Sequence, residues 1–251
     1  MATYKEIKGT QIEVLATDPS NPIEGQVWYN STSNVVKGLA ATTAGSWATG
    51  GTLNQVRDQA AGSGTTTSTL VFGGGPPNKA QTEKYNGTNW TEVADLNTAR
   101  RGIAGAGADN TLALAFGGGT PSSSSTEAWN NTSWTAVNSL NTARYFLGGT
   151  GVKTAALAFG GTIDPPNTNI TEKWNDTCWS EVADLNTTRA GLTGAGVVNS
   201  ALAFGGTPPV TGATESWNET CWTTVNPLNT ARVGAGGAGA SNTSAIAFGG
   251  G

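Results

Sequence analysis

Three short motifs recur along the chain at a nearly constant spacing of 43 to 45 residues. The tripeptide Phe-Gly-Gly begins at Phe72, Phe116, Phe159, Phe204 and Phe248. A segment of the form Leu-Asn-x-x-Arg ends at Arg57, Arg100, Arg144, Arg189 and Arg232, and a tryptophan keeps the same period at Trp47, Trp90, Trp134, Trp179 and Trp222. A period of this length is typical of propellers and arrays, in which each repeat buries its apolar surface against its neighbours.

One repeat, residues 100–144, predicts four short strands separated by turns, at 101–108, 111–118, 126–130 and 134–140. The first contains small residues that suit a crowded position near a central axis, and the second is apolar and ends at a glycine pair. We expect the tryptophan that opens the fourth strand to fill the gap between neighbouring sheets. No helical periodicity is present, and 36 glycines among 251 residues disfavour long helices. The sequence therefore predicts an all-β fold with four strands per repeat, the number in a propeller blade.

The order of the markers resembles the kelch repeat of β-propellers of the galactose oxidase type. The markers come in the order arginine, strand, glycine pair, Glu-x-Trp-Asn segment (with tyrosine in place of tryptophan at residues 83–86), a tryptophan about seven residues after the glutamate, and Leu-x-x-x-Arg. The resemblance covers about residues 47–251 and implies a propeller of kelch-like blades. Copper oxidases of this fold use histidine and tyrosine ligands, whereas this chain has no histidine. The resemblance therefore extends to the scaffold and not to the copper chemistry.

Five copies of the inner strand pair are present, but only four are followed by an outer pair. The last inner pair, residues 233–250, would leave an unpaired sheet edge, which natural sheets avoid. Residues 26–53 contain the strand-like segments QVWYN and VVKGL and the in-register Trp47. We therefore predict a five-bladed propeller over residues 26–251, closed by N-terminal strands, with residues 1–25 as an N-terminal extension. In the alternative, the N-terminal hairpin docks elsewhere and mounts the ring on another protein.

Residues 4–39, from YKEIKG to VVKGL, resemble the opening segment of structural proteins from phages of marine cyanobacteria. This likeness implies a virion context, with residues 1–25 as the attachment segment and the particle surface as the location. The chain shows neither the apolar region of a secretory signal nor a stretch long enough to span a membrane, so we expect synthesis in the host cytoplasm and no membrane insertion.

Several classes of function are disfavoured by composition. Without histidine, the chain has no Ser-His-Asp or Cys-His nucleophile and no histidine-ligated metal. A net charge of −4 and the absence of a basic cluster argue against nucleic acid as a partner. Cys178 and Cys221 occupy equivalent repeat positions, which should lie too far apart for a disulfide, so we predict free thiols. We expect no catalysis, no cofactor and no metal.

The loops between the second and third strands, at 75–81, 118–124, 162–170 and 207–213, vary among repeats although the adjacent strands hardly change. Binding residues are commonly carried by exposed loops on a rigid scaffold. In the alternative, these loops vary because nothing constrains them. The predicted ligand or receptor face includes the loop residues Asn78, Lys79, Ser122, Asp164, Asn167 and Thr211.

The repeated arginines are predicted to form a ring at the same face. Guanidinium groups bind carboxylates in a bidentate manner, so such a ring would suit an anion or an acidic glycan. In the structural alternative, each arginine pairs with a repeat carboxylate or with backbone carbonyl groups of its own blade. That alternative is favoured because four of the five arginines have a glutamate in register. These glutamates are Glu83, Glu127, Glu172 and Glu215.

Together these features predict a non-enzymatic phage virion protein of the tail, fibre or capsid, which displays a propeller for host-surface adhesion or protein–protein assembly. Expected partners are other virion proteins through the N-terminal segment, a host-surface glycan or protein, and further copies of the chain. The alternative is a free, lectin-like propeller in which exposed aromatic residues stack on sugars. An enzyme on a propeller scaffold is a third hypothesis, which no residues support.

Overall fold

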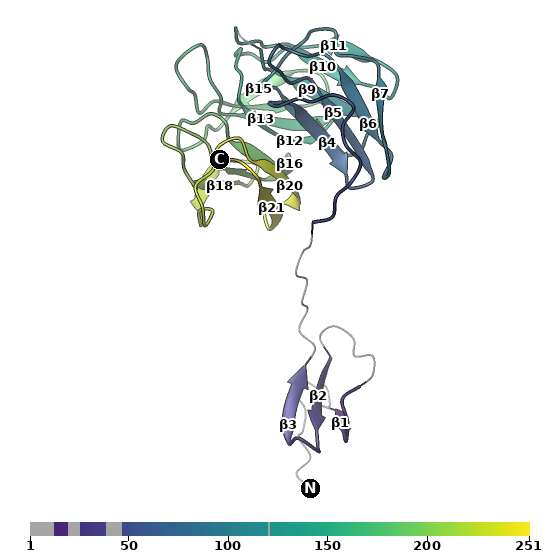
Figure 1. The fold of residues 1–251 in the computed structure, drawn as a ribbon. Coiled ribbons are helices and arrows are strands. Elements are labelled where there is room, and N and C mark those ends of the chain that lie inside the picture. The colour runs from purple at the N-terminus through teal and green to yellow at the C-terminus, as the bar shows by residue number, and fades with distance from the viewer. Residues whose placement is uncertain (1–12, 20–25, 39–46, 120) are drawn as a thin grey trace. The chain divides into compact units, whose positions relative to one another are not determined.

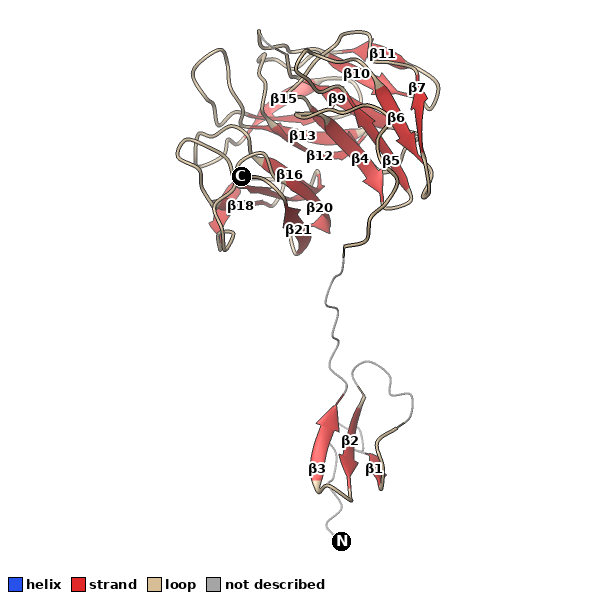
Figure 2. Cartoon of the chain, in the orientation of Figure 1, coloured by secondary structure: helices blue, strands red, loops and turns tan. Residues whose placement is uncertain are grey.

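The computed structural model describes residues 13–19, 26–38, 47–119 and 121–251. The chain divides into two compact units, Met1–Thr49 and Gly50–Gly251. All regular structure in the described residues is β-strand (Figure 2), which confirms the all-β prediction. No described segment forms a helix with the length and apolar character needed to cross a membrane.

The N-terminal unit contains a three-stranded sheet of β1 (Glu13–Leu15), β2 (Val27–Asn30) and β3 (Val35–Gly38). The central strand β2 pairs in parallel with β1 and antiparallel with β3. The carboxylate of Asp18 accepts hydrogen bonds from Lys37 Nζ at 2.7 Å, Asn30 Nδ2 at 2.7 Å and Trp28 Nε1 at 3.0 Å. These contacts, led by the hydrogen bond from Lys37, lower the pKa of Asp18 from 3.8 to about 2.

We expect the N-terminal unit to lose stability in acid because of Asp18. A carboxyl whose pKa is lower in the folded than in the unfolded state stabilises the fold above its unfolded pKa, and this contribution disappears as the pH falls through the folded pKa. The loss should therefore run from about pH 4 to about pH 2. NMR of the Trp28 indole proton during an acid titration of the full chain measures it. In Asp18→Asn the transition in this window should be absent, and an unchanged transition would assign it to another group.

The second unit contains four antiparallel four-stranded sheets, in each of which the strands pair in chain order. The first sheet is β4 (Ala61–Thr65), β5 (Ser68–Phe72), β6 (Thr82–Tyr85) and β7 (Trp90–Val93). The second is β8 (Ala104–Gly107), β9 (Ala113–Phe116), β10 (Thr126–Trp129) and β11 (Trp134–Val137). The third is β12 (Gly148–Val152), β13 (Ala155–Phe159), β14 (Thr171–Trp174) and β15 (Trp179–Val182). The fourth is β16 (Thr193–Val197), β17 (Ser200–Phe204), β18 (Thr214–Trp217) and β19 (Trp222–Val225).

The first strands of successive sheets contact one another in the order β4, β8, β12, β16 and β20 (Figure 1), as the inner strands of a propeller do. Glycines in these strands leave room for a phenylalanine of the preceding sheet. A Cβ atom on Gly149 would lie 2.7 Å from Cζ of Phe116, and one on Gly194 would lie 2.6 Å from Cζ of Phe159. Both separations are too short for carbon atoms, so the small residues are required by the packing, as expected for a crowded inner strand.

The fifth sheet contains only β20 (Gly236–Ser241) and β21 (Ser244–Phe248) among the described residues. The predicted closure by N-terminal strands is not observed there. Strand β2 already has β1 on one edge and β3 on the other, so no edge of β2 is left to pair with β21. Residues 39–46 of the predicted closing segment lie outside the described residues.

Candidate functional site

Four of the five repeated arginines are buried and form ion pairs with glutamates of the third strands. Their side chains and those of their partners are at most 3% exposed. The N–O distances are 2.5 Å for Arg57–Glu83, 2.7 Å for Arg100–Glu127, 3.2 Å for Arg144–Glu172 and 2.9 Å for Arg189–Glu215. This is the structural alternative that the sequence favoured.

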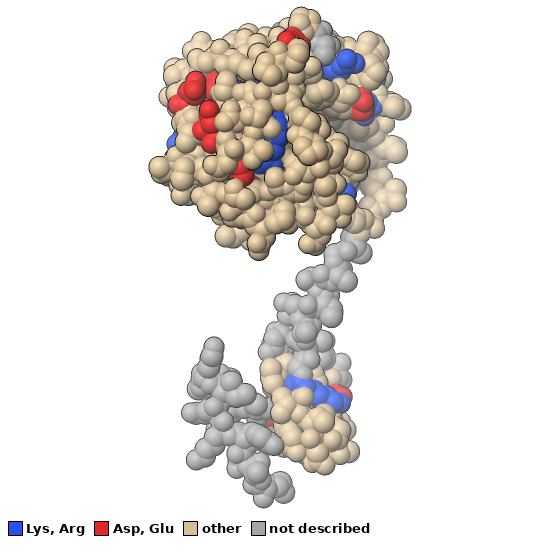
Figure 3. Space-filling model, turned by 90° about the vertical axis from the view of Figure 1, so that its left-hand side faces the viewer, with Lys and Arg blue, Asp and Glu red and all other residues tan. Residues whose placement is uncertain are grey.

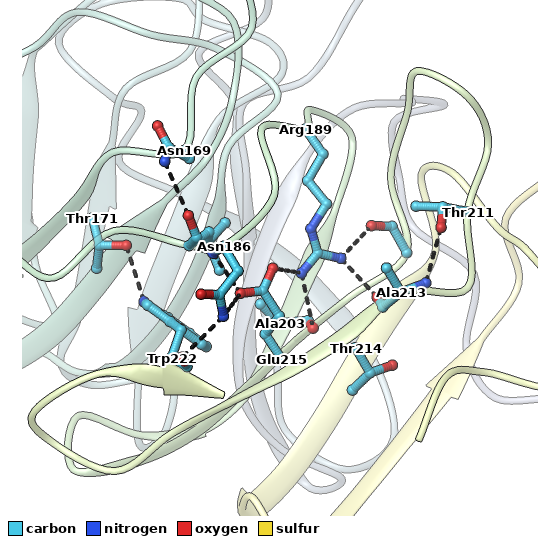
Figure 4. A network of polar contacts seen from close by, with 12 residues as sticks. Asn169, Thr171, Asn186, Arg189, Ala203, Thr211, Ala213, Thr214, Glu215 and Trp222 are labelled. Carbon is cyan, nitrogen blue, oxygen red and sulfur yellow. Dashed lines mark hydrogen bonds and ion pairs between the residues drawn. The ribbon is translucent and has the colours of Figure 1, made fainter. Parts of the chain in front are cut away.

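The surroundings of Arg189 show how such a pair is held (Figure 4). Its Nη1 donates to the carbonyl oxygens of Gly205 and Ala213, each at 2.7 Å, while Nη2 donates to Glu215 Oε1 at 2.9 Å. The other carboxylate oxygen accepts hydrogen bonds from the backbone N–H and side-chain amide of Asn186, at 2.7 and 2.9 Å. The segment between two sheets is thereby tied to the third strand of the sheet that follows it.

Burial lowers the pKa of Arg100, Arg144 and Arg189, and the paired glutamates oppose this effect by raising it. Each of these guanidinium groups therefore depends on its glutamate for a counter-charge inside the fold. A charged group this deeply buried is already paired and is closed to an external anion. Arg57, Arg100, Arg144 and Arg189 therefore do not belong to the predicted ligand face.

The asparagines that hold the glutamates were not predicted from the sequence. They stand three residues before each buried arginine, at Asn54, Asn97, Asn141 and Asn186, and each donates through its backbone and side chain to the glutamate of the following sheet. The signal was present in the constant Leu-Asn pair at the start of every Leu-Asn-x-x-Arg segment. When the same polar residue recurs at one repeat position beside a buried charge, it indicates a hydrogen-bond network that the repeats share.

Arg232 differs from the other four arginines. It is partly exposed, and its Nη1 donates to the carbonyl oxygen of Gly249, the counterpart of Gly205 in the fourth sheet. Within the described part of the chain it has no ion pair with a carboxylate. It is the one repeated arginine that stays a candidate for the predicted ligand face.

The predicted filling of the gap between sheets by tryptophan is confirmed at three junctions. Each indole ring packs against a phenylalanine of the preceding sheet, with ring centroids 4.9 Å apart for Phe72–Trp134, 4.9 Å for Phe116–Trp179 and 5.0 Å for Phe159–Trp222. Each Nε1 also donates to a threonine hydroxyl of the preceding sheet, at 2.9 to 3.1 Å. The acceptors are Thr82, Thr126 and Thr171.

Hydrogen bonds join successive variable loops. The backbone N–H and hydroxyl of Ser122 donate to Asp164 Oδ2 at 2.7 and 2.9 Å, which links the second loop to the third. Asn167 Nδ2 donates to the carbonyl oxygen of Thr207 at 3.2 Å, which links the third loop to the fourth. Three of the predicted site residues, on two loops, therefore take part in hydrogen bonds between neighbouring loops.

The other three predicted loop residues lie apart from this network. Lys79 Nζ donates to the carbonyl oxygen of Val56, in the segment that precedes the first sheet. Thr211 accepts a hydrogen bond from Ala213 N within its own loop, and Asn78 is partly exposed. No hydrogen bond between the Asn78 or Thr211 side chain and a neighbouring loop occurs among the described residues.

Charged side chains are sparse on the face of the propeller unit seen in Figure 3, where they form small groups among neutral residues. In the described ranges, no group of three or more His, Cys, Asp or Glu residues is placed to hold a metal ion. Cys178 and Cys221 are exposed and free, as predicted.

Comparison with known proteins identifies the fold alone. No protein-family model and no curated protein matches the sequence. Among solved structures, the chain is similar to the one titled "Structure of YjhT", with a TM-score of 0.62 and 12% sequence identity over 75% of this chain and 71% of that chain. A likeness at this identity supports a propeller-like arrangement of antiparallel sheets and carries no information on activity.

Proposed function

We propose that the chain is a non-enzymatic structural protein of a phage virion, whose kelch-like propeller is displayed for host-surface adhesion or protein–protein assembly. One observation carries this proposal. The polar groups common to the repeats are used inside the sheets, in ion pairs such as Arg189–Glu215, while the groups that differ among repeats lie on joined loops such as those of Ser122 and Asp164. A constant interior with a variable surface is what recognition on a rigid scaffold requires.

The two-unit organisation supports the same proposal. A small N-terminal unit with its own sheet precedes the propeller unit, and its sequence resembles the opening segment of cyanophage structural proteins. In the proposed arrangement the N-terminal unit holds other virion proteins, and the propeller unit carries the adhesive loops. The attachment role of residues 1–25 remains part of this proposal.

An adsorption assay tests the adhesive role. The purified full chain should compete with phage particles for host cells, and Asp164→Ala, which removes the acceptor shared by both Ser122 donors, should weaken competition about tenfold. Asp176→Ala is the matched control, because Asp176 is also exposed and accepts one hydrogen bond, from Lys153, but lies in an outer hairpin turn. Equal effects of the two variants would contradict a role for the loops.

The virion location has its own test. A map of the assembled particle should contain the propeller at regular positions. If the chain does not purify with particles but binds neutral or acidic sugars on a glycan array, the free lectin-like module replaces the virion proposal.

A further inference from the structure

The same backbone conformation recurs two residues after every repeated arginine, at the residue that stands two positions before each inner strand. Its φ lies between 51° and 64°, in the left-handed region. From the second sheet onward, its N–H donates to the carbonyl oxygen of its counterpart before the preceding sheet, at 2.8 or 2.9 Å. We call these five residues the junction positions, and they are Gln59, Gly102, Phe146, Gly191 and Gly234. They join successive sheets by a chain of backbone hydrogen bonds.

Phe146 is unusual at a junction position. A side chain crowds the backbone in the left-handed region, and glycine, which avoids this crowding, occupies three of the five positions. A residue as bulky as phenylalanine is a clear outlier there. Such outliers lower the stability of the fold and cluster at functional sites. The ring of Phe146 therefore needs a role that Gly191, its counterpart before the fourth sheet, does not have.

Phe146 and the preceding Tyr145 form an aromatic pair outside the hydrophobic cores. Their ring centroids lie 4.9 Å apart, and both side chains are partly exposed. The Phe146 ring lies against Gly102, where a Cβ atom would come within 2.9 Å of the ring atom Cδ1. Among the described residues, the core clusters between sheets include neither ring. The pair therefore keeps part of its aromatic surface open to solvent.

Two variable loops begin beside this aromatic pair. The backbone of Tyr145 exchanges two hydrogen bonds with that of Thr162, at the start of the third loop, with N–O distances of 3.1 and 2.8 Å. In the second loop, the N–H of Gly119 donates at 2.7 Å to the carbonyl oxygen of Arg101, which directly precedes the glycine that contacts the pair. Asp164 joins these two loops to each other. Its carboxylate therefore belongs to a loop that is anchored at the aromatic pair.

We propose that Tyr145 and Phe146 are the stacking platform for a neutral pyranose ring of a host-surface glycan. A pyranose has an apolar face of C–H groups, which packs on aromatic rings, and hydroxyl groups at its edge, which need hydrogen-bond partners. The aromatic pair fits the first, and the carboxylate of Asp164, with acceptor capacity for several donors, fits the second. The negative charge of that carboxylate disfavours an anionic sugar. A sugar bound here is the ligand of the proposed adhesive role, on which this assignment rests.

The double variant Tyr145→Ala with Phe146→Gly tests the platform, because it gives the third sheet the Ala-Gly pair that the fourth sheet has at the same positions. The full-length chain is applied to an array of neutral and uronic-acid oligosaccharides, and the neutral oligosaccharide that binds best is titrated by calorimetry. We expect the double variant to bind it at least about tenfold more weakly than the parent does. Gln59→Gly is the matched control, since it places glycine at another exposed junction position without removing an aromatic ring, and its affinity should equal that of the parent.

Unfolding in denaturant separates a binding role of the two rings from a structural one. Glycine adopts the left-handed conformation of residue 146 without crowding, so the midpoint of the double variant should fall much less than that of Trp179→Ala. A fall as large as in Trp179→Ala would mean that the rings support the fold, and it would overturn the proposal. Binding of uronic-acid oligosaccharides alone, or of no oligosaccharide, also overturns it.

Competition with phage particles for host cells distinguishes failure of the platform from failure of the adhesive role. If the parent chain competes but its double variant competes equally well, the platform is wrong and the adhesive role stands. If the parent chain binds the neutral oligosaccharide through the platform but does not compete, the adhesive role is wrong, and the platform belongs to the free lectin-like module.

Discussion

Glu127→Gln should lower the free energy of unfolding by about 3–5 kcal/mol, the usual cost of removing one partner of a buried ion pair. Glu127 receives Arg100 Nη2 at 2.7 Å and both donors of Asn97 at 2.7 Å. Glutamine keeps the shape of the side chain but leaves a guanidinium that is only 1% exposed without a counter-charge. Denaturant titration measures the loss, with an unchanged dependence of the unfolding free energy on denaturant if the fold is retained.

The matched control is Asp176→Asn, which removes the same charge from the exposed Lys153–Asp176 pair. Exposed pairs contribute less than about 1 kcal/mol, so this variant should be nearly as stable as the parent. If both substitutions lower the free energy of unfolding by the same amount, burial does not increase the contribution of the Arg100–Glu127 pair to stability.

Trp179→Ala should have an effect of similar size, about 3–5 kcal/mol, because a large buried ring is removed from a junction between sheets. The side chain is 5% exposed, its ring centroid lies 4.9 Å from that of Phe116, and Nε1 donates to Thr126 Oγ1 at 3.1 Å. Trp179→Phe keeps part of the apolar contact and loses the hydrogen-bond donor. Its free energy of unfolding should therefore lie between those of the parent and the alanine variant. Thermal and denaturant unfolding measure both variants.

Trp90→Ala is the comparison within the same register. Trp90 opens the fourth strand of the first sheet, is partly exposed, and packs on Tyr85 of its own hairpin at 4.9 Å. Its indole donates to the carbonyl oxygen of Gly51 and not to a threonine of a preceding sheet. We expect Trp90→Ala to lower the free energy of unfolding by less than half as much as Trp179→Ala. A loss as large as at Trp179 would show that the contact with the preceding sheet is not what the tryptophan contributes.

The sequence predicted the strands of the propeller unit well, because their pattern is local and repeated five times. The four strands expected within residues 100–144 occur as β8 to β11 with shorter bounds. QVWYN and VVKGL also form strands, β2 and β3, but in the N-terminal unit and not in the fifth sheet. The ion pairs of the buried arginines could also be predicted, because each of the first four arginines has a glutamate in register. Such pairs follow from the rule that a buried charge needs a partner.

The strands that complete the fifth sheet could not be predicted from the local sequence pattern. A hairpin whose sequence fits one sheet edge can also pair with another strand. Strand β2 is flanked by β1, a segment with no repeat marker. Asp18, which follows β1, accepts hydrogen bonds from Trp28 and Asn30 of β2 and from Lys37 of β3. The link between Ser122 and Asp164 was likewise invisible, since 42 residues separate them and neither position recurs. Long-range contacts between unique residues leave no periodic trace.

The junctions between sheets are chemically alike: a phenylalanine ring meets a glycine of the next inner strand, and an indole reaches back to a threonine. Nothing in these contacts marks which junction is the second and which the third. Insertion or loss of one whole repeat by unequal recombination would therefore create only junctions of a kind already present. An added repeat would therefore bring a new surface loop without requiring a new kind of contact in the interior.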